Sequence, residues 1–203
     1  MPAASARSQP DERLLFERAR SGPDGFIELY DRFFADVYSY VYYRTRNRTI
    51  TEDVVAETFT AALGAIGRLE WRGRPIRAWL FRIAANELVT YYRKHRELLQ
   101  MPRDEGEDGR NDELETGQQP WQTDEPASPE RRAEQTLDYE TALSAIARLP
   151  ADQQEAIIMR YVNDLEVSEI ALALDRTEGA VRALISRGLR GLRAKLACEG
   201  GAT

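Results

Sequence analysis

The amino-acid sequence predicts an all-α protein with two small helical domains joined by a flexible acidic linker, the C-terminal domain containing a helix-turn-helix. Apolar residues recur at steps of three and four through both halves of the chain, whereas strand-like alternation is nearly absent. A central stretch is rich in acidic residues, glycine and proline and poor in aliphatic residues, as flexible linkers are. A chain of 203 residues is long enough for two such domains.

The domain boundaries follow from these changes in composition. We expect an N-terminal segment at 1–23, a helical domain at 24–97, the linker at 98–128, the helix-turn-helix domain at 129–197 and a tail at 198–203. The first ten residues are polar and carry no signal-peptide pattern. No apolar run approaches the roughly 20 residues that a membrane-spanning helix needs, so membrane insertion is not expected.

The N-terminal domain is predicted to be a compact helical bundle. A short helix opens at Pro10 and stops at Ser21-Gly22-Pro23. Thr49 and Glu52 have the T-x-x-E spacing of a capping box, and Pro75 suits the first turn of a helix. Together with the apolar spacing, these signals predict helices over about 24–46, 50–69 and 75–96.

The C-terminal domain begins with a strong helix-start signal. Ser128-Pro129-Glu130 combines an N-cap serine with proline at the first helical position, and Pro150 ends the helix that starts there. Thr177 is a natural N-cap for the last helix. The apolar spacing predicts further helices over about 151–162, 167–174 and 177–196.

Charge is distributed unevenly along the chain, although the net charge is −6. Residues 68–96 contain eight arginine or lysine residues and two glutamates, and residues 176–195 contain six basic residues and one glutamate. The intervening residues 97–138 contain thirteen acidic residues and four arginines. Two basic segments that flank an acidic one favour a protein that binds nucleic acid.

The composition argues against catalysis and metal binding. Cys198 is the only cysteine and His95 the only histidine, so an intramolecular disulfide is impossible, and neither an ordinary zinc site nor a convincing Ser-His-Asp set is found. His95 lies among Arg93, Lys94 and Arg96, which indicates a basic surface. We find no glycine-rich phosphate-binding loop. We therefore expect no enzyme activity, no cofactor, no metal and no small-molecule substrate, in a cytoplasmic protein.

The last two predicted helices are separated by only a few residues around Asp175-Arg176, which indicates a helix-turn-helix. The second helix presents a basic face that fits the major groove, where arginine can donate two hydrogen bonds to guanine. The residues of that face are Arg182, Ser186, Arg187, Arg190 and Arg193. A solvated basic helix that packs on its neighbour is the competing explanation, and the motif alone indicates only a DNA-binding module.

The C-terminal half carries Leu149-Pro150, Gln154-Glu155, Met159-Arg160-Tyr161, Leu165, Glu169-Ile170-Ala171, Ala173-Leu174 and Gly179-Ala180-Val181-Arg182. These motifs resemble the promoter-binding domain of extracytoplasmic-function (ECF) sigma factors of bacterial RNA polymerase. In the N-terminal half, residues 52–59 resemble the polymerase-docking helix of the same family, and residues 77–86 with 91–94 resemble its promoter-melting segment. The resemblance spans about 24–96 and 130–196, in the order of the family.

This resemblance implies a factor that binds core RNA polymerase, directs it to promoter DNA, helps to open that DNA and is often controlled by an anti-sigma factor. It places polymerase binding on Glu52, Asp53, Val54, Ala56, Glu57 and Phe59. It places recognition of the downstream promoter element and DNA melting on Trp71, Arg72, Arg74, Arg82, Asn86, Thr90, Arg93 and Lys94. It places recognition of the upstream element on Thr177, Arg182, Ser186, Arg187 and Arg190.

The chemistry of these residues agrees with the implied roles. Asp53 and Glu57 lie four residues apart and share a helix face that can meet basic residues of polymerase, although an acidic helix start is also an ordinary feature. Trp71 lies in a loop that either captures an unstacked base or packs on the core. Asn86 can contact base edges without carrying charge. We expect Trp79 to lie in the core.

Three residues of the helix-turn-helix depart from the family pattern. Leu184 stands where a basic residue is common, Asp175 replaces the usual turn glycine, and Arg176 replaces an apolar residue. Aspartate tolerates left-handed backbone geometry, so the fold is expected to survive, but the upstream DNA contacts cannot simply be copied from the family. The acidic linker is expected either to mimic RNA in a basic channel of polymerase or to act as a tether.

Two other classes of protein fit part of the sequence. A stand-alone helix-turn-helix regulator would bind a palindromic site as a dimer, without polymerase. An adaptor or anti-sigma protein would not need the recognition helix. The two basic segments on either side of a linker favour the sigma factor over both alternatives.

Overall fold

The computed structural model describes residues 9–100 and 142–199, and every regular element within these ranges is helical. In chain order the elements are α1 (Gln9–Ser21), α2 (Pro23–Thr45), α3 (Arg48–Ile66), α4 (Ile76–Gln100), α6 (Ala151–Ile157), the π-helix η1 (Ile158–Val162), α7 (Val167–Leu174) and α8 (Glu178–Glu199). A helical stretch over residues 142–147 precedes α6. The predicted all-α fold is therefore confirmed.

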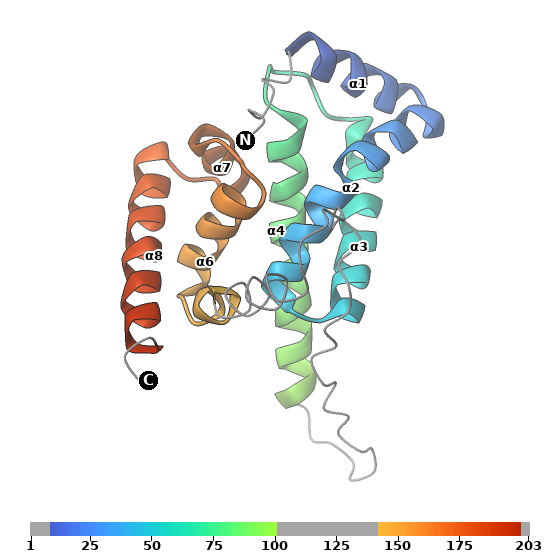
Figure 1. Cartoon of the computed structure of the whole chain (residues 1–203). Helices are drawn as coiled ribbons and strands as arrows, with labels where there is room; N and C mark the ends of the chain where they lie inside the picture. Colours follow the sequence, from blue (N-terminus) through green and yellow to red (C-terminus); the bar gives the residue numbers. More distant parts are fainter. Residues whose placement is uncertain (1–8, 101–141, 200–203) are drawn as a thin grey trace, which may run out of the picture.

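The N-terminal domain is a bundle of α2, α3 and α4, with α1 lying across one end (Figure 1). The largest buried face belongs to α2 and includes Leu29, Phe33, Val37, Tyr40 and Val41. Their steps of four, four, three and one keep them on one side of the helix. Gly25 allows α1 to approach α2 closely, because a Cβ atom at this position would overlap the carbonyl oxygen of Arg18.

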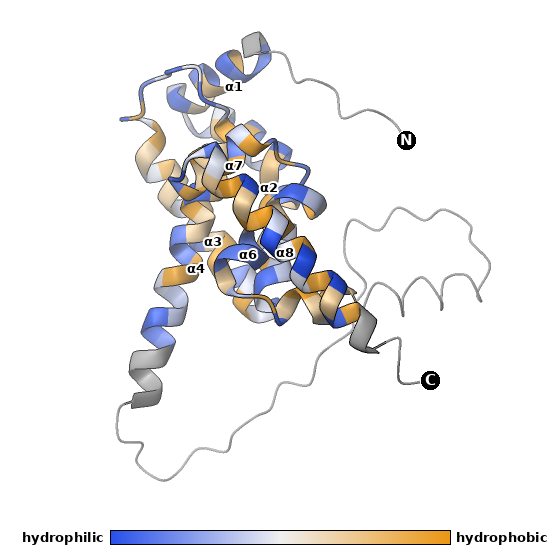
Figure 2. Ribbon diagram, turned by 90° about the vertical axis from the view of Figure 1, so that its left-hand side faces the viewer, coloured by the Kyte–Doolittle hydropathy of each residue, from blue (hydrophilic) through white to orange (hydrophobic). Residues whose placement is uncertain are grey.

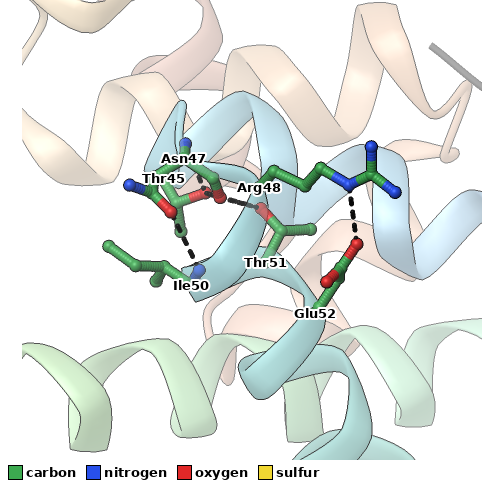
Figure 3. Close-up of polar contacts among 6 residues, drawn as sticks. All are labelled: Thr45, Asn47, Arg48, Ile50, Thr51 and Glu52. Atoms are coloured by element: carbon green, nitrogen blue, oxygen red, sulfur yellow. Dashed lines mark hydrogen bonds and ion pairs between the residues drawn. The ribbon is translucent and has the colours of Figure 1, made fainter. Parts of the chain in front are cut away.

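The start of α3 differs from the prediction. The prediction of a capping box formed by Thr49 and Glu52 is wrong. The helix begins at Arg48 and its N-cap is Asn47, whose side-chain oxygen accepts a hydrogen bond from the Ile50 N–H at 3.0 Å (Figure 3). Glu52 instead accepts a hydrogen bond from the side chain of Arg48 at 2.8 Å. The extended backbone of Asn47 (φ −136°) lets its short carboxamide reach the third helical amide, so the cap forms two residues before the predicted one.

The end of α4 also differs from the prediction. The helix continues to Gln100 instead of ending near Arg96, so residues 98–100 are helical and do not belong to the predicted linker. The sequence there, Glu97-Leu98-Leu99-Gln100, consists of strong helix formers. The rest of the linker and the predicted cap at Ser128-Pro129-Glu130 lie outside the described residues.

The turn of the helix-turn-helix lies where it was predicted, whereas α8 continues to Glu199, past the predicted end at Leu196, and includes the first two residues of the predicted tail. Helix α7 ends at Leu174, and Asp175 adopts the left-handed conformation with φ 53°. Thr177 is confirmed as the N-cap of α8, because its hydroxyl oxygen accepts a hydrogen bond from the Ala180 N–H at 3.2 Å. Leu184 is buried, which explains why an apolar residue occupies a position that is commonly basic in the family.

The predicted helix over 151–162 changes its hydrogen-bonding pattern in its second half. Residues 158–162 form a π-helical turn, which the N–H of Asn163 closes by bonding to the carbonyl of Ile158 at 3.1 Å. The N–H of Leu165 bonds to the carbonyl of Met159 at 2.9 Å. Single π turns are rare and occur often at functional positions. Here the π turn places Asn163 at the boundary between the two domains.

The two domains touch, and their buried residues form one continuous hydrophobic core. Helix α7 packs along α4, and η1 packs on α2. Figure 1 shows α6 and α7 on one side of α4, with α8 outermost. Figure 2 shows hydrophilic residues along α8 and towards the end of α4, the two segments predicted to be basic.

Candidate nucleic-acid interface

The loop between α3 and α4 and the start of α4 line a cavity of about 360 Å³. Trp71, Arg72, Arg74 and Trp79 contribute to its lining. Trp71 is half-buried and its ring packs on Phe16, with 5.3 Å between the ring centroids. Trp79 is partly buried against the core, as predicted. Trp71 therefore packs on the core, which is one of the two roles considered for it, and it also lines the cavity.

The arginines of this loop lie at the surface. Arg72 and Arg74 are exposed, and Arg72 pairs with the exposed Glu70 at 3.0 Å. Gly73 lies between them with φ 68°, a left-handed conformation that glycine adopts without strain. An exposed ion pair contributes little free energy, so Arg72 can exchange Glu70 for a nucleic-acid phosphate at small cost.

A polar stripe on α4 continues from this loop and consists of residues predicted to contact the downstream element. Its residues are Arg82 and Thr90, which are half-buried, and Asn86 and Arg93, which are exposed; the exposed Lys94 lies beside Arg93. Steps of four, four and three place the four stripe residues on one side of the helix. The end of the stripe is flanked by His95 stacked on Tyr91, with 3.9 Å between the ring centroids. Burial, followed by the charge of Asp53, raises the pKa of the Tyr91 hydroxyl above its ordinary value of 10.0.

The outer face of α8 carries the predicted upstream set. Its members are all exposed and comprise Thr177, Arg182, Ser186, Arg187 and Arg190. Arg182 pairs with Glu178 on the preceding turn at 2.6 Å. Because both side chains are exposed, this pair too is easily exchanged for a DNA contact.

Arg160 joins this face, although it was not predicted as a site residue. A hollow of about 460 Å³ is lined by Arg160 and Arg193 together with Arg182, Ser186 and Arg190. The Met159-Arg160-Tyr161 motif was the available sequence signal, but the motif does not say which way Arg160 points. Four arginines around one hollow suit contact with phosphates and with guanine edges.

The acidic face on α3 contains four of the six predicted polymerase-binding residues. Glu52, Asp53, Ala56 and Glu57 are exposed. Val54 and Phe59 are 2% and 4% exposed and belong to the core, so they are not part of the exposed acidic face. The helical repeat of 3.6 residues explains the division, because it turns these two side chains away from the face that Asp53 and Glu57 share.

The sequence did not predict a polar cluster where the domains meet. We call it the interdomain cluster, and it consists of Asp36, Tyr40, Arg77, Glu155 and Asn163. The Asn163 side-chain amide donates to the Asp36 carbonyl at 3.0 Å, and Arg77 donates to the Asn163 carbonyl. Arg77 also pairs with the Asp36 carboxylate at 3.2 Å. The Tyr40 hydroxyl donates to Glu155 at 2.6 Å. The partners that belong to different domains lie 86 to 127 residues apart and so leave no local sequence pattern.

Within residues 9–100 and 142–199, no helix is both long and apolar enough to cross a bilayer. The same residues contain no group of three or more histidine, cysteine or acidic side chains placed to hold a metal ion.

Comparison with known proteins decides the family. The Sigma-70 region 2 family matches residues 29–97, and the Sigma-70 region 4 family matches residues 139–192. The chain is 34% identical over 192 residues to the ECF RNA polymerase sigma factor BldN of Streptomyces coelicolor, which covers 94% of this chain and 67% of that protein. This chain belongs to the ECF RNA polymerase sigma factors. The resemblance noted in the sequence is thereby confirmed, and the alternative of a stand-alone regulator is rejected.

This sigma factor is also similar to a second curated relative and to two solved structures. It is 26% identical over 172 residues to the ECF RNA polymerase sigma factor SigX of Bacillus subtilis, covering 83% of this chain and 81% of SigX. Its fold resembles CnrH in complex with the cytosolic domain of CnrY, with TM-score 0.65, 24% identity and coverage of 92% and 97% of the two chains. It also resembles RpoE in complex with the anti-sigma factor NepR from Bartonella quintana, with TM-score 0.60, 22% identity and coverage of 84% and 97%.

Proposed function

We propose that this sigma factor docks on core RNA polymerase through the acidic face of α3 and contacts promoter DNA through two basic surfaces. The first, the loop–α4 surface, consists of Trp71, Arg72, Arg74, Arg82, Asn86, Thr90, Arg93 and Lys94. The second, the α8 surface, consists of Thr177, Arg182, Ser186, Arg187 and Arg190. The observation that carries the proposal is that two arginine-rich surfaces and one acidic face occupy different helices of a single chain.

Docking on polymerase rests on charge complementarity. Asp53 and Glu57 present two carboxylates on one exposed helix face, which basic residues of polymerase can approach. Such charges raise the association rate more than they raise the affinity, and their effect weakens as the salt concentration rises.

Opening of the DNA rests on the cavity beside Trp71. A volume of about 360 Å³ lies within the range of small-ligand pockets, and its lining offers the Trp71 indole for stacking and four arginines, Arg68, Arg72, Arg74 and Arg82, for hydrogen bonds. These are the features that hold a base removed from the duplex. Asn86, Arg93 and Lys94 then extend the contact along α4, with the amide facing base edges and the cations facing phosphates.

Recognition of the upstream element rests on α8. Arg182 lies near the N-terminus of the helix, where recognition helices contact base edges, and Arg187 and Arg190 follow it at positions suited to phosphates. The weak Arg182–Glu178 pair lets the guanidinium turn towards a guanine.

Control by an anti-sigma factor is part of the proposal. It is supported by the solved structures that share this fold, since CnrH is in complex with the cytosolic domain of CnrY and RpoE with the anti-sigma factor NepR. The chain acts with RNA polymerase in the cytoplasm and needs no cofactor, because polymerase supplies the chemistry of RNA synthesis.

The test is run-off transcription by purified core polymerase on a promoter library, with and without this protein. We expect specific start sites only when the protein is present. Trp71→Ala should abolish opening of those promoters, whereas Trp71→Phe, which keeps an aromatic ring beside Phe16, should retain most of it. Specific initiation without the protein, or none with it, would refute the proposal.

A further inference from the structure

We propose that α1 holds the loop between α3 and α4 in the position needed for base capture, through Glu12, Phe16 and Arg20. These three are positioning residues, because they act on the base through Trp71 and the backbone of the loop. None of them belongs to the two basic surfaces defined above. The inference deepens the proposed function, on which it rests for the base that the cavity receives.

Trp71 rests on an aromatic residue of α1. The centroid of its ring lies 5.3 Å from that of Phe16, and the two ring planes are inclined at 43°. Phe16 is 1% exposed and also lines the cavity of about 360 Å³. An aromatic pair contributes more than the burial of its surface alone. The indole is therefore held beside the cavity by a residue that is itself fixed in the core.

Glu12 fixes the end of the loop where α4 begins. Its side-chain oxygen accepts a hydrogen bond from the backbone N–H of Ile76, the first residue of α4, at 3.3 Å. The amides of the first helical turn have no partner within the helix, and the helix dipole favours a carboxylate beside them. Glu12 therefore acts as a cap for α4, although it lies 64 positions earlier in the chain.

Arg20 fixes the other end of the loop. Its guanidinium donates to the carbonyl of Gly67 at 3.2 Å, directly after α3 ends at Ile66. The same guanidinium lies 5.6 Å from the centre of the Phe16 ring. Steps of four place Glu12, Phe16 and Arg20 on one side of α1. One face of this helix thus contacts both ends of the loop and the indole between them.

The loop needs support of this kind because it has little regular structure of its own. The chain forms no helix between Ile66 and Ile76, and Gly73 has φ 68°. Arg72 and Arg74 are exposed. Binding groups on a loop are placed less precisely than groups held by rigid elements, unless neighbouring residues fix them. The contacts with α1 provide this fixation for the side chains proposed to hold a base.

Two other charged residues of α1 pair away from the loop and provide matched controls. Arg18 pairs with Glu28 of α2 at 3.2 Å, and Glu17 pairs with Arg13 of α1 at 2.9 Å. All four side chains are exposed. The control variants are therefore Glu17→Ala and Arg18→Ala. The loop variants, which remove contacts with the loop, are Glu12→Ala, Phe16→Leu and Arg20→Ala.

Fluorine NMR of the full chain labelled with fluorotryptophan measures the position of the loop. The chain has three tryptophans, and the signal of Trp71 is the one that Trp71→Phe removes. The loop variants should move this signal towards that of the free amino acid, and the control variants should not. Glu12→Gln keeps an acceptor oxygen for Ile76 and should stay close to the parent. A Trp71 signal that all three loop variants leave in place would overturn the proposal.

Base capture is measured in the holoenzyme formed with core polymerase. The probe is the fluorescein-labelled non-template single strand of a promoter selected by run-off transcription, intact or with an abasic site at each position in turn. The parent should bind the intact strand about tenfold more tightly than the strand that lacks the captured base, and Trp71→Ala should abolish this ratio. Each loop variant should lower the ratio about threefold, because a displaced indole stacks less completely on the base. The control variants should keep it.

The ratio separates positioning from a general loss of structure. Unfolding lowers the binding of both strands alike, and phosphate contacts are the same in both, so neither changes the ratio. Glu12→Ala and Arg20→Ala keep the test decisive if Phe16→Leu, which alters the core, fails to fold. Loop variants that discriminate as well as the parent would overturn the proposal. A parent that discriminates at no position would instead refute the proposed function, while a displaced Trp71 signal would still show that α1 holds the loop.

Discussion

Arg182 makes only a weak internal contact, which suits the contact with DNA that we propose for it. Its ion pair with Glu178 is exposed, so exchanging Glu178 for a base costs little. We predict that Arg182→Ala lowers transcription from specific promoters by about tenfold or more, which corresponds to about 1–3 kcal/mol of lost base recognition. Polymerase binding should not change, and Arg13→Ala on α1 serves as the control. Loss of polymerase affinity in Arg182→Ala would contradict this assignment.

Asp53 carries the second prediction for a single side chain. Reversing its charge with Asp53→Arg should weaken binding to core polymerase by about tenfold at low salt, with a smaller loss at high salt because exposed charges are screened. The fold should persist because Asp53 is exposed. Binding is measured by fluorescence anisotropy with core polymerase, and Glu17→Arg on α1 is the control. An affinity equal to that of the parent chain would remove Asp53 from the docking surface.

The start of α3 illustrates how a helix boundary can be tested by its caps. Asn47 bonds to the Ile50 amide, so Asn47→Ala should lower the free energy of unfolding by about 1 kcal/mol. Thr49→Ala should have no such effect and can gain a few tenths of a kcal/mol from the higher helix propensity of alanine. Chemical denaturation of both variants provides the comparison. A larger loss in Thr49→Ala than in Asn47→Ala would restore the capping box predicted from the sequence.

Substitutions at two glycines distinguish the effect of close helix packing on stability from the effect of helix propensity. Gly25→Ala should destabilise the protein by about 1–3 kcal/mol, since the new Cβ would overlap the Arg18 carbonyl and push α1 away from α2. Gly64→Ala lies on α3 with no atom within 4 Å of the added Cβ and should stabilise by about 0.5–1 kcal/mol. Thermal melting of the two variants should therefore shift in opposite directions. Equal shifts would argue against the close approach of α1 to α2.

At the level of the assembled chain, Tyr40 links stability to pH through the contact between the domains. Burial, followed by the charge of Glu155, raises the pKa of Tyr40 well above its ordinary value of 10.0, while Arg44 acts in the opposite direction. The folded protein therefore favours the neutral form of the Tyr40 phenol. The contribution of Tyr40 to the free energy of unfolding is complete below pH 10.0 and is lost as the pH rises above 10.0. Melting temperatures measured up to and beyond pH 10.0 should fall more steeply for the parent chain than for Tyr40→Phe. Parallel curves would mean that Tyr40 does not carry this linkage.

Much of the fold was predictable because its signals are local. Helix periodicity, the Ser21-Gly22-Pro23 break, the Thr177 cap and the tight turn at Asp175 all act within a few residues, and each one is present in the structure. The basic faces of α4 and α8 were predictable for the same reason, since a helix places every third or fourth side chain on one side. Local signals failed where two of them competed, as with Asn47 and Thr49 at the start of α3.

The sequence alone specified the helices, their order, the family and the charged faces, because these properties depend on neighbouring residues. Only the packing of the helices decided that Val54 and Phe59 are core residues, that Arg160 joins the α8 surface and that Leu172 of α7 lines the cavity beside Trp71. The same is true of the contact of Asn163 with Asp36, which spans 127 positions. Such contacts exist only after the whole chain has folded, when buried area and polar pairing between distant segments determine which faces meet.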